Sequence, residues 1–589
     1  MKSLSYLNKY LVKYKWRLIL GSIFITASNY FGVEMPFIVR DSINLFAEKV
    51  LSLKGKALSE LDKTEVLESA IYLALFYVAF SLLRGFFVFL NRQTIIIMSR
   101  LIEYDLKNEI YSHYQKLTPA FYKKNNTGDL MNRISEDVSK VRMYLGPAIM
   151  YSINLFVLSI LVIYYMVSVN LELTLYALTP LPFMTIMIYY ISRLMNKRSE
   201  EVQNQQSVIS TFVQESFSGI RVVKAYNMQK SLSASFMNEA NEYKSRSMKL
   251  ATINALFFPV IVLLIGVSTV LTIYIGGIKV DEGVITNGDI ALFVIYVNML
   301  TWPFASIGWV TSMVQRAAAS QKRINEFLEQ EPDIYSKEDA VPMKGGDIVF
   351  DDVSFVYPDS GIKALQNISF VLPEGKTLGI IGETGSGKTT IANMIARLYD
   401  VDNGQIKIGD SPIENINLNE LRAAIGYVPQ DAFLFSDSIS NNIKFGLSDI
   451  GENSNELMEQ AAKDAHIYDN IVEFDKGFET VVGERGITLS GGQKQRVSIA
   501  RAIIKQPDVL VFDDCLSAVD TETEDIILRN LKRIMKGKTS VIISHRISSL
   551  EHADLIIVMN EGKIIEQGSH DELMNQNGYY TSLNEKQKG

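Results

Sequence analysis

The chain has 589 residues, of which 48% are hydrophobic, and its formal net charge at pH 7 is −7. This length predicts several domains, the negative charge argues against nucleic acid as a partner, and the mean hydropathy of +0.11 is high for a soluble protein. Its single cysteine, Cys515, excludes an intramolecular disulfide. We expect this thiol to be a small packed residue, and the alternative is a reactive thiol.

The N-terminal segment, residues 1–17, is basic and contains no acidic residue. A long apolar run follows it, too long for a signal peptide. Basic residues that directly precede a membrane span keep that end of the chain in the cytoplasm. We therefore expect a cytoplasmic N-terminus.

Six apolar runs in the first half of the chain reach the length of about 20 residues that a helix needs to cross a bilayer. Two long polar gaps, near 94–140 and 194–249, are compatible with helices and fall on the cytoplasmic side. The sequence thus predicts an α-helical membrane domain over residues 1–325, with six transmembrane helices and two long cytoplasmic helical loops. The runs lie near 18–42, 70–93, 141–168, 171–193, 250–277 and 289–315.

Arg84 lies within the second apolar run, where a charge usually faces the protein interior or a water-filled cavity. Three interpretations are open: a cavity-facing position relevant to a substrate, a buried structural pair, or a side chain that reaches the membrane interface. Most aromatic residues of the runs are expected to be packing or interfacial residues, and some are candidates for lining a substrate cavity.

The pattern changes near residue 346 to short β-branched runs that alternate with glycine turns and helical stretches. This alternation predicts an α/β domain with a largely parallel sheet over residues 346–589. The preceding segment, 326–345, is polar, contains two prolines and is predicted to be a linker.

A phosphate-binding loop is indicated by GIIGETGSGKTT, which ends an apolar strand and opens a helix. Glycines let backbone amides turn toward phosphate oxygens, and the helix N-terminus adds its positive end. Lys388 is expected to reach the β- and γ-phosphates, and the Thr389 hydroxyl and Asp513, which ends the run VLVF, are expected to bind Mg²⁺. The loop residues predicted to bind ATP are Gly382, Glu383, Thr384, Gly385, Ser386, Gly387, Lys388, Thr389 and Thr390.

A second anion-binding segment is LSGGQ, residues 489–493, which precedes the apolar-periodic stretch KQRVSIARAII. Its Ser490, Gly491 and Gly492 would leave backbone amides free at a helix start. The chain therefore carries two phosphate-binding motifs, well separated in sequence.

Together these motifs resemble those of ABC exporter half-transporters, and the resemblance covers nearly the whole chain. LSGGQ matches the ABC signature, and the family's other nucleotide-binding motifs follow in order. The resemblance implies a role for each of these residues. Tyr357 would stack on adenine, Gln430 would contact Mg²⁺ and the attacking water, and His545 would contact the γ-phosphate. Asp520 matches the D-loop aspartate, and the signature contacts to ATP would come from Ser490, Gly491, Gly492 and Gln493.

The resemblance also implies a dimer. In the family, two nucleotide-binding domains join head to tail, and each ATP lies between the phosphate-binding loop of one chain and the signature of the other. Residues 121–138 and 215–227 resemble the intracellular loops that dock on these domains, and VVGERG, 481–486, resembles the loop that touches them. A second half-transporter is thus an expected partner.

Asp514 departs from the family pattern, in which glutamate follows the magnesium-binding aspartate. Loss of one methylene misplaces the catalytic carboxylate, and a misplacement of about 1 Å can cost ~10²-fold in rate. We therefore expect ATP binding with slow hydrolysis. Similar aspartates occur in the degenerate halves of heterodimeric bacterial multidrug exporters, and the context DDCLSAVD looks closest to MdlA-like halves. A homodimer in which aspartate is competent is the alternative.

The sequence is best interpreted as a transporter ATPase of a bacterial inner membrane, with its nucleotide-binding domain in the cytoplasm. It is expected to export amphipathic compounds (drugs, lipids or peptides) by alternating access, as the degenerate half of a heterodimer. An ATP-gated channel or regulatory subunit is an alternative, and a soluble ABC ATPase is disfavoured by the six spans.

Overall fold

The computed structural model describes residues 2–52, 60–447, 449, 451–483, 486, 488–515 and 521–588. Contacts between Cα atoms divide the chain into two compact units. The first comprises Met1–His113 and Gly128–Gln330, and the second comprises Tyr114–Thr127 and Glu331–Gly589. The short segment Tyr114–Thr127 thus packs with the C-terminal unit, although it lies far from that unit in the sequence.

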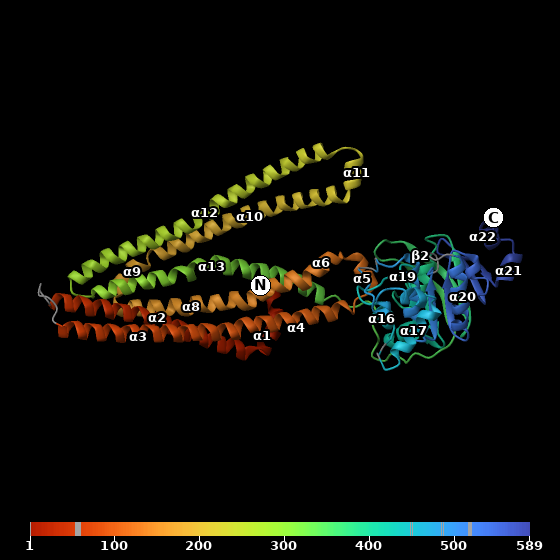
Figure 1. Cartoon of the computed structure of the whole chain (residues 1–589), viewed down its shortest axis with the longest axis horizontal. Coiled ribbons are helices and arrows are strands. Elements are labelled where there is room, and N and C mark those ends of the chain that lie inside the picture. The colour runs from red at the N-terminus through yellow and green to blue at the C-terminus, as the bar shows by residue number, and fades with distance from the viewer. Residues whose placement is uncertain are drawn as a thin grey trace. The chain divides into compact units, whose positions relative to one another are not determined.

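Long helices make up the first unit, and six of the described helices are long and apolar enough to cross a membrane (Figure 1). Large apolar side chains such as Leu82 and Phe156 are 69% and 68% exposed on them, a surface that suits lipid better than water. The predicted six spans are confirmed. They are Lys15–Glu48, Leu67–Tyr114, Thr127–Val169, Leu171–Ser218, Gln229–Asp281 and Asn287–Leu328.

Local sequence explains where several of these helices begin or change pitch. The last one opens with a capping box, in which the side chains of Thr286 and Asp289 each accept a backbone N–H of the other residue. Three short π-helical turns interrupt the others, at Arg92–Ile96, Arg133–Asp137 and Tyr144–Ala148. After a 3₁₀ turn (Lys2–Leu7), the helices are α1 (Asn8–Lys13), α2 (Lys15–Ser52), α3 (Glu60–Asn91), α4 (Ile97–Tyr114), α6 (Thr127–Asn132), α7 (Val138–Met143), α8 (Ile149–Val169), α9 (Leu171–Leu178), α10 (Pro180–Ser218), α11 (Ile220–Ala225), α12 (Gln229–Asp281) and α13 (Asn287–Leu328).

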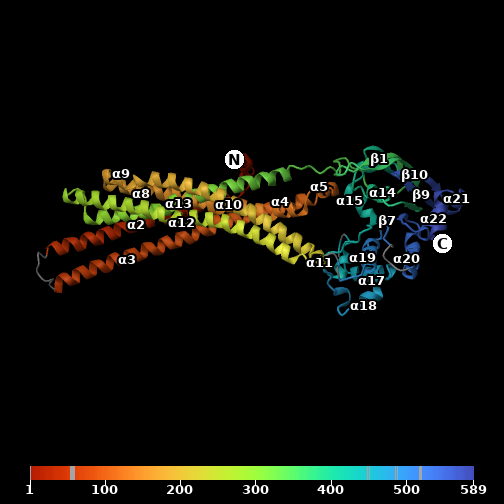
Figure 2. The ribbon, with the colours of Figure 1, turned by 90° about the horizontal axis from the view of Figure 1, so that it is seen from above.

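The polar gap predicted near 194–249 is largely a continuation of two spans. Figures 1 and 2 show α10 and α12 side by side along most of their length, joined by the short α11. Because α10 ends at Ser218 and α12 begins at Gln229, the same helices carry both the apolar and the polar residues.

The core of the first unit forms around α13. The Tyr296 hydroxyl donates a hydrogen bond of 2.9 Å to the Val33 carbonyl oxygen of α2 and so joins two spans. Leu173 of α9 and Val162 of α8 pack in the same cluster. Fully buried side chains on α13 include Leu292, Phe293, Tyr296, Val297 and Leu300.

Arg84 lies on α3 and is exposed in this chain. It lies against α2, where a Cβ atom added to Gly32 would be 3.3 Å from the Arg84 Nε. A glycine at this position therefore leaves room for the guanidinium beside α2. The three interpretations of Arg84 stay open.

The second unit contains two β-sheets among its described residues. One has four strands in the order β2-β1-β4-β5, paired antiparallel, and the other has six in the order β10-β9-β3-β8-β7-β6. In the larger sheet only the β9–β10 pair is antiparallel, so the predicted largely parallel sheet is confirmed. The strands are β1 (Ile348–Val356), β2 (Lys363–Leu372), β3 (Thr377–Gly382), β4 (Asn403–Ile408), β5 (Ser411–Pro412), β6 (Ile425–Val428), β7 (Val509–Asp513), β8 (Thr539–Ile543), β9 (Leu555–Asn560) and β10 (Lys563–Gly568).

Strands β7 and β8 are buried at every residue, as expected for parallel strands that are covered on both faces. Cys515, just after β7, is 3% exposed, and burial raises the pKa of its thiol. This thiol is therefore packed, as expected. The helices of this unit are α5 (Pro119–Lys124), α14 (Lys388–Ile395), α15 (Leu418–Ala424), α16 (Ile439–Lys444), α17 (Ser454–Asp464), α18 (Tyr468–Val472), α19 (Gly491–Ile503), α20 (Thr521–Met535), α21 (His570–Asn575) and α22 (Tyr579–Lys588).

A buried carboxylate ties α13 to the π-helical turn before α7. Asp137 is 3% exposed and accepts hydrogen bonds from the Ser320 hydroxyl at 2.8 Å and the Arg323 Nε at 2.9 Å. Arg323 also forms an ion pair with it through Nη2. A buried carboxylate is costly without such partners.

We expect Arg323→Gln to destabilise the first unit, because it removes the nearer cation of the buried Asp137 and leaves Lys140, whose Nζ lies 3.9 Å from the Asp137 Oδ1. Since the Arg323 side chain is 46% exposed, we expect a loss of about 1–2 kcal/mol, less than for a fully buried pair. A thermal melt of the detergent-solubilised protein, monitored by size-exclusion chromatography after heating to each temperature, would show a lower Tm. Lys322→Gln is the matched control, since Lys322 is 73% exposed in its ion pair. Equal melting temperatures for both variants would contradict the role of Asp137.

Candidate nucleotide-binding site

The loop between β3 and α14 has the backbone shape of a phosphate cradle. Gly385 and Gly387 have φ angles of 84° and 100°, in the left-handed region that favours glycine. A Cβ atom at Gly387 would lie 2.3 Å from the Ala364 carbonyl oxygen, so no larger residue fits there. The loop ends at the N-terminus of α14, whose free amides add to the positive potential.

Lys388 spans this loop from the first residue of α14. Its side chain is buried, and its Nζ donates to the carbonyl oxygens of Gly382 at 2.9 Å and Glu383 at 2.7 Å. Burial lowers the pKa of Lys388, and the charges of Asp514 and Asp513 oppose that shift. The ammonium group thus lies at the loop that is expected to hold phosphates.

Asp513 and Thr389 form the candidate magnesium site. The Thr389 hydroxyl donates to the Asp513 Oδ1 at 3.0 Å, while the buried Oδ2 has no hydrogen-bond partner among the described residues. Burial raises the pKa of Asp513 to about 6, against the opposing hydrogen bond from Thr389. A hydroxyl and a carboxylate with an unpaired oxygen are ligands that Mg²⁺ prefers, so these residues fit the ion.

Asp514 lies beside this pair in an unusual backbone conformation. Its φ angle is 44°, and its backbone N–H donates to the Ile543 carbonyl oxygen of β8 at 2.9 Å. Its Oδ2 accepts a long hydrogen bond of 3.5 Å from the Gln430 Nε2. The structure thus brings together two residues that are predicted to take part in catalysis, one directly after β7 and one in the loop after β6.

These residues line one cavity of about 280 Å³. His545, which follows β8, lies on its wall with Asp513 and Asp514. The sequence did not single out three further lining residues, Ile362, Ala364 and Ile543, because isolated apolar residues at strand ends carry no motif. Predicted residues on the wall are Tyr357, Thr384, Gly385, Gly387, Lys388, Thr389, Thr390, Gln430, Asp513, Asp514 and His545.

Tyr357 is held at the cavity by its neighbours. Its hydroxyl and that of Thr390 are 3.1 Å apart, and its ring makes an edge-on contact with Tyr399 at a centroid distance of 5.4 Å. Lys123 of α5 places its Nζ 4.5 Å from the Tyr357 ring centroid, a cation–π distance. Sequence reasoning missed Lys123, although it lies within the segment 121–138 that resembles an intracellular loop.

The signature motif lies apart from this cavity. Ser490 caps α19, since its hydroxyl accepts the Gln493 N–H while the Gln493 side chain accepts the Ser490 N–H. None of the described residues that line the cavity belongs to the signature. Asp520, and Glu484 and Arg485 of the VVGERG segment, lie outside the described residues.

Comparisons with known proteins cover most of the chain. Residues 18–304 match the ABC transporter transmembrane region family, and residues 365–517 match the ABC transporter family. The chain is 40% identical to the probable multidrug resistance ABC transporter ATP-binding/permease protein YheI of Bacillus subtilis, over 83% of this chain and 84% of that protein. It is 36% identical to the multidrug resistance-like ATP-binding protein MdlA of Escherichia coli, over 81% of each chain.

A lipid transporter and a solved exporter structure are also similar. The ATP-dependent lipid A-core flippase of Vibrio vulnificus is 31% identical over 86% of this chain and 87% of its own length. The structure of a bacterial Atm1-family ABC exporter with ATP bound superposes with a TM-score of 0.78 over 97% of this chain and 99% of that one, at 24% identity, which shows the shared fold. The chain therefore belongs to the ABC transporter family, as an exporter-type half-transporter whose six-span membrane domain precedes an ATP-binding domain that hydrolyses ATP to drive transport.

Proposed function

We propose that this chain is one half of a bacterial inner-membrane exporter for amphipathic compounds, with its N-terminus and nucleotide-binding domain in the cytoplasm. The proposed domains are residues 1–325, a linker over 326–345, and residues 346–589. The names of its relatives, two of multidrug type and one that moves lipid A-core, support amphipathic substrates. The proposed partners are a second half-transporter, the lipid bilayer and the transported compound, and nucleic acid is not among them.

The observation that carries this proposal is the division of the nucleotide-binding groups. One cavity gathers Lys388, Thr389 and Asp513, while the signature residue Ser490 does not line it. A second chain would supply a signature to this cavity, and the LSGGQ of this chain would serve the partner's cavity. ATP would therefore be enclosed only in a dimer.

Each residue of the cavity has a defined task in this proposal. Lys388 holds the β- and γ-phosphates, Tyr357 stacks on adenine, and Thr389 and Asp513 hold Mg²⁺. Mg²⁺, when bound, neutralises charge on the phosphates. Asp514 and Gln430 would orient the attacking water, Gln430 would also contact Mg²⁺, and His545 would contact the γ-phosphate.

We further infer that hydrolysis at this chain's own cavity is slow. The Asp514 carboxylate is one methylene shorter than a glutamate, and its backbone is fixed by the hydrogen bond to Ile543. The backbone therefore cannot shift freely to compensate for the shorter side chain, which favours pairing with a competent partner. The second candidate is a homodimer, favoured by the long but present Gln430–Asp514 hydrogen bond.

The rate of MgATP hydrolysis tests the role of Asp514. We expect the chain purified alone in nanodiscs to hydrolyse ATP near background, and Asp514→Glu to raise the rate tenfold or more, because the longer side chain reaches the water. Lys388→Ala in each background is the control for contaminating ATPases. Ordinary transporter rates in the wild type would contradict a slow site and favour the homodimer.

The complex isolated from its native membrane should respond unequally to changes in the two motifs. We expect Ser490→Arg to abolish ATP hydrolysis, because the signature of this chain completes the partner's competent cavity. Lys388→Ala should leave a substantial part of the rate, because it disables only the slow cavity. Equal losses in the two variants, measured as phosphate release, would indicate two equivalent sites.

The cation–π contact of α5 gives a test of how the membrane domain is linked to the nucleotide site. Lys123→Met keeps the aliphatic stem but removes the charge over the Tyr357 ring, so we expect a smaller stimulation of ATP hydrolysis by transported compounds. The neighbouring Lys124→Met is the matched control, since no cation–π contact of Lys124 occurs among the described residues. Unchanged stimulation in Lys123→Met would show that the contact is only structural.

A further inference from the structure

A cavity of about 470 Å³ lies between α10 and α13 in the first unit, and we call it the α10–α13 pocket. This volume is within the range of ligand-binding pockets. Its walls come from two matching helical faces, with four residues of α10 at spacings of four, three and four, and four of α13 at the same spacings. They are Thr185, Tyr189, Ser192 and Asn196 on α10, and Phe304, Gly308, Thr311 and Gln315 on α13.

The two faces are close because Gly308 has no side chain. A Cβ atom at Gly308 would lie 2.9 Å from the Ser192 hydroxyl oxygen, so any larger residue would crowd α10 at this point. The pocket extends from Thr185 to Asn196 on α10 and from Phe304 to Gln315 on α13, twelve residues on each helix, or about 17 Å at 1.5 Å per residue. It is therefore elongated along the helices.

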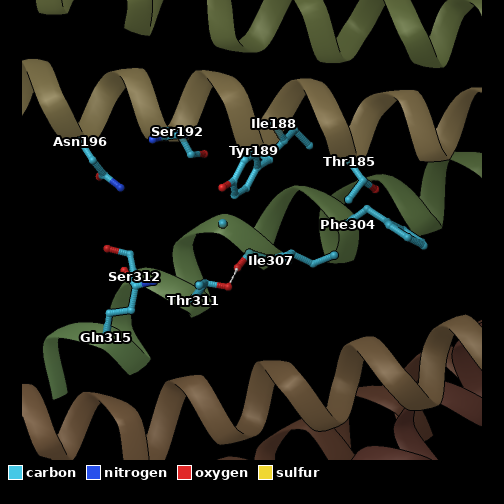
Figure 3. Close-up of a pocket in the computed structure, with 12 residues that line it drawn as sticks. Thr185, Ile188, Tyr189, Ser192, Asn196, Phe304, Ile307, Thr311, Ser312 and Gln315 are labelled. Atoms are coloured by element: carbon cyan, nitrogen blue, oxygen red, sulfur yellow. Dashed lines mark hydrogen bonds between the residues drawn. The ribbon is translucent and has the colours of Figure 1, made fainter. Parts of the chain in front are cut away.

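The pocket is more polar at one end than at the other (Figure 3). Asn196, Ser312 and Gln315 lie at one end, whereas Phe304 lies at the other beside Thr185, whose hydroxyl donates to the Leu181 carbonyl oxygen at 3.1 Å. The side chains of Asn196, Ser312 and Gln315 make no hydrogen bond among the described residues, although their backbones belong to α10 and α13. Their polar groups are therefore available to a ligand, and the pocket matches an amphipathic molecule.

The charge of the wall selects among amphipathic molecules. Among the described residues that line the pocket, Arg193 is the one that carries a charge, and none is an aspartate or a glutamate. In the described part of the chain no carboxylate lies within 4.0 Å of Arg193 to form an ion pair. A guanidinium without a carboxylate, at the end of an apolar run, favours an anion and disfavours a cation.

We propose that the α10–α13 pocket binds amphipathic molecules with a single anionic headgroup, with the headgroup at Arg193 and the tail against Ile188, Ile307 and Phe304. This inference deepens the proposed function, on which it rests, by naming the substrate class. The headgroup receives hydrogen bonds from Asn196 and Gln315 as well as from the guanidinium. The ligand is either an anionic lipid of the bilayer or a free anionic amphiphile.

Photolabelling of the full chain in zwitterionic lipid nanodiscs tests the pocket. The probes are a diazirine-bearing undecanoic acid and the matched undecylammonium compound, and mass spectrometry locates the labelled peptides. We expect the carboxylate probe to label peptides of α10 and α13 and the ammonium probe to leave them at background. Equal labelling by the two probes would overturn the proposal.

Variants of Arg193 sharpen this experiment. We expect Arg193→Gln to need about tenfold more carboxylate probe for half-maximal labelling, because a charge-assisted contact is lost. Arg193→Lys should recover part of that loss, which keeps the test valid if the glutamine variant folds poorly. Lys197→Gln is the matched control, one turn further on α10 and outside the described lining. Equal behaviour of the Arg193→Gln and Lys197→Gln variants would contradict an anion site at Arg193.

Two further measurements are needed. One distinguishes the two possible sources of the ligand, and the other distinguishes a failure of this proposal from a failure of the proposed function. Competition by phosphatidylglycerol added to the nanodiscs would identify membrane lipid as the ligand, and its failure to compete would identify a free amphiphile. Labelling needs no ATP, so its failure leaves the proposed function standing. In contrast, ATP-dependent transport that persists in the Ser490→Arg complex would overturn the proposed function and leave the pocket standing.

Discussion

The parallel pairing of β8 with β3 on one side and β7 on the other fixes the position of the groups that this chain offers to a nucleotide. Ile543 of β8 is the partner of both Ile380 of β3 and Asp513 of β7. The strands on either side of β8 therefore end at the same edge of the sheet. The carboxyl ends of parallel strands form the binding edge of an open α/β sheet. Hydrogen bonding of the sheet therefore brings the phosphate-binding loop and the acidic pair together.

The same strand restricts Asp514. Its N–H is paired with the Ile543 carbonyl oxygen, and its positive φ angle follows directly after the end of β7. A non-glycine residue in this region is held there by its surroundings. The length of the side chain, and not the flexibility of the backbone, then decides how far the carboxylate reaches. In the proposed function, a side chain shorter by one methylene therefore limits hydrolysis at this cavity.

Most of the residues predicted to bind the nucleotide line one cavity, because each part of the candidate site is a local motif with a local cause. Position 387 requires glycine because the Ala364 carbonyl oxygen leaves no room for a Cβ atom, and Asp513 is the last residue of the fully buried strand β7. Contacts between distant segments had no such signal. Lys123 and Tyr357 meet only after folding. The helices expected near 194–249 are continuous with the neighbouring spans, and the polarity of this segment does not indicate that continuity.

The α10–α13 pocket had a signal in the sequence, but a faint one. Polar residues recur at helical spacing through an apolar run, and Arg193 ends that run, where a basic residue is usually taken to mark the membrane interface. The pairing of the two faces depends on the close approach at Gly308, which periodicity does not reveal.

One helix connects the features of the first unit. α13 carries one wall of the pocket, contains the buried face around Tyr296, and holds Asp137 through Arg323 before it ends at Leu328. A ligand shifts a conformational equilibrium only by its difference in affinity for the two states. A pocket between α10 and α13 changes its shape when these helices move relative to each other, since both helices supply its walls. Ligand binding at this place therefore acts on the same helix that leads, along the chain, to the nucleotide-binding domain.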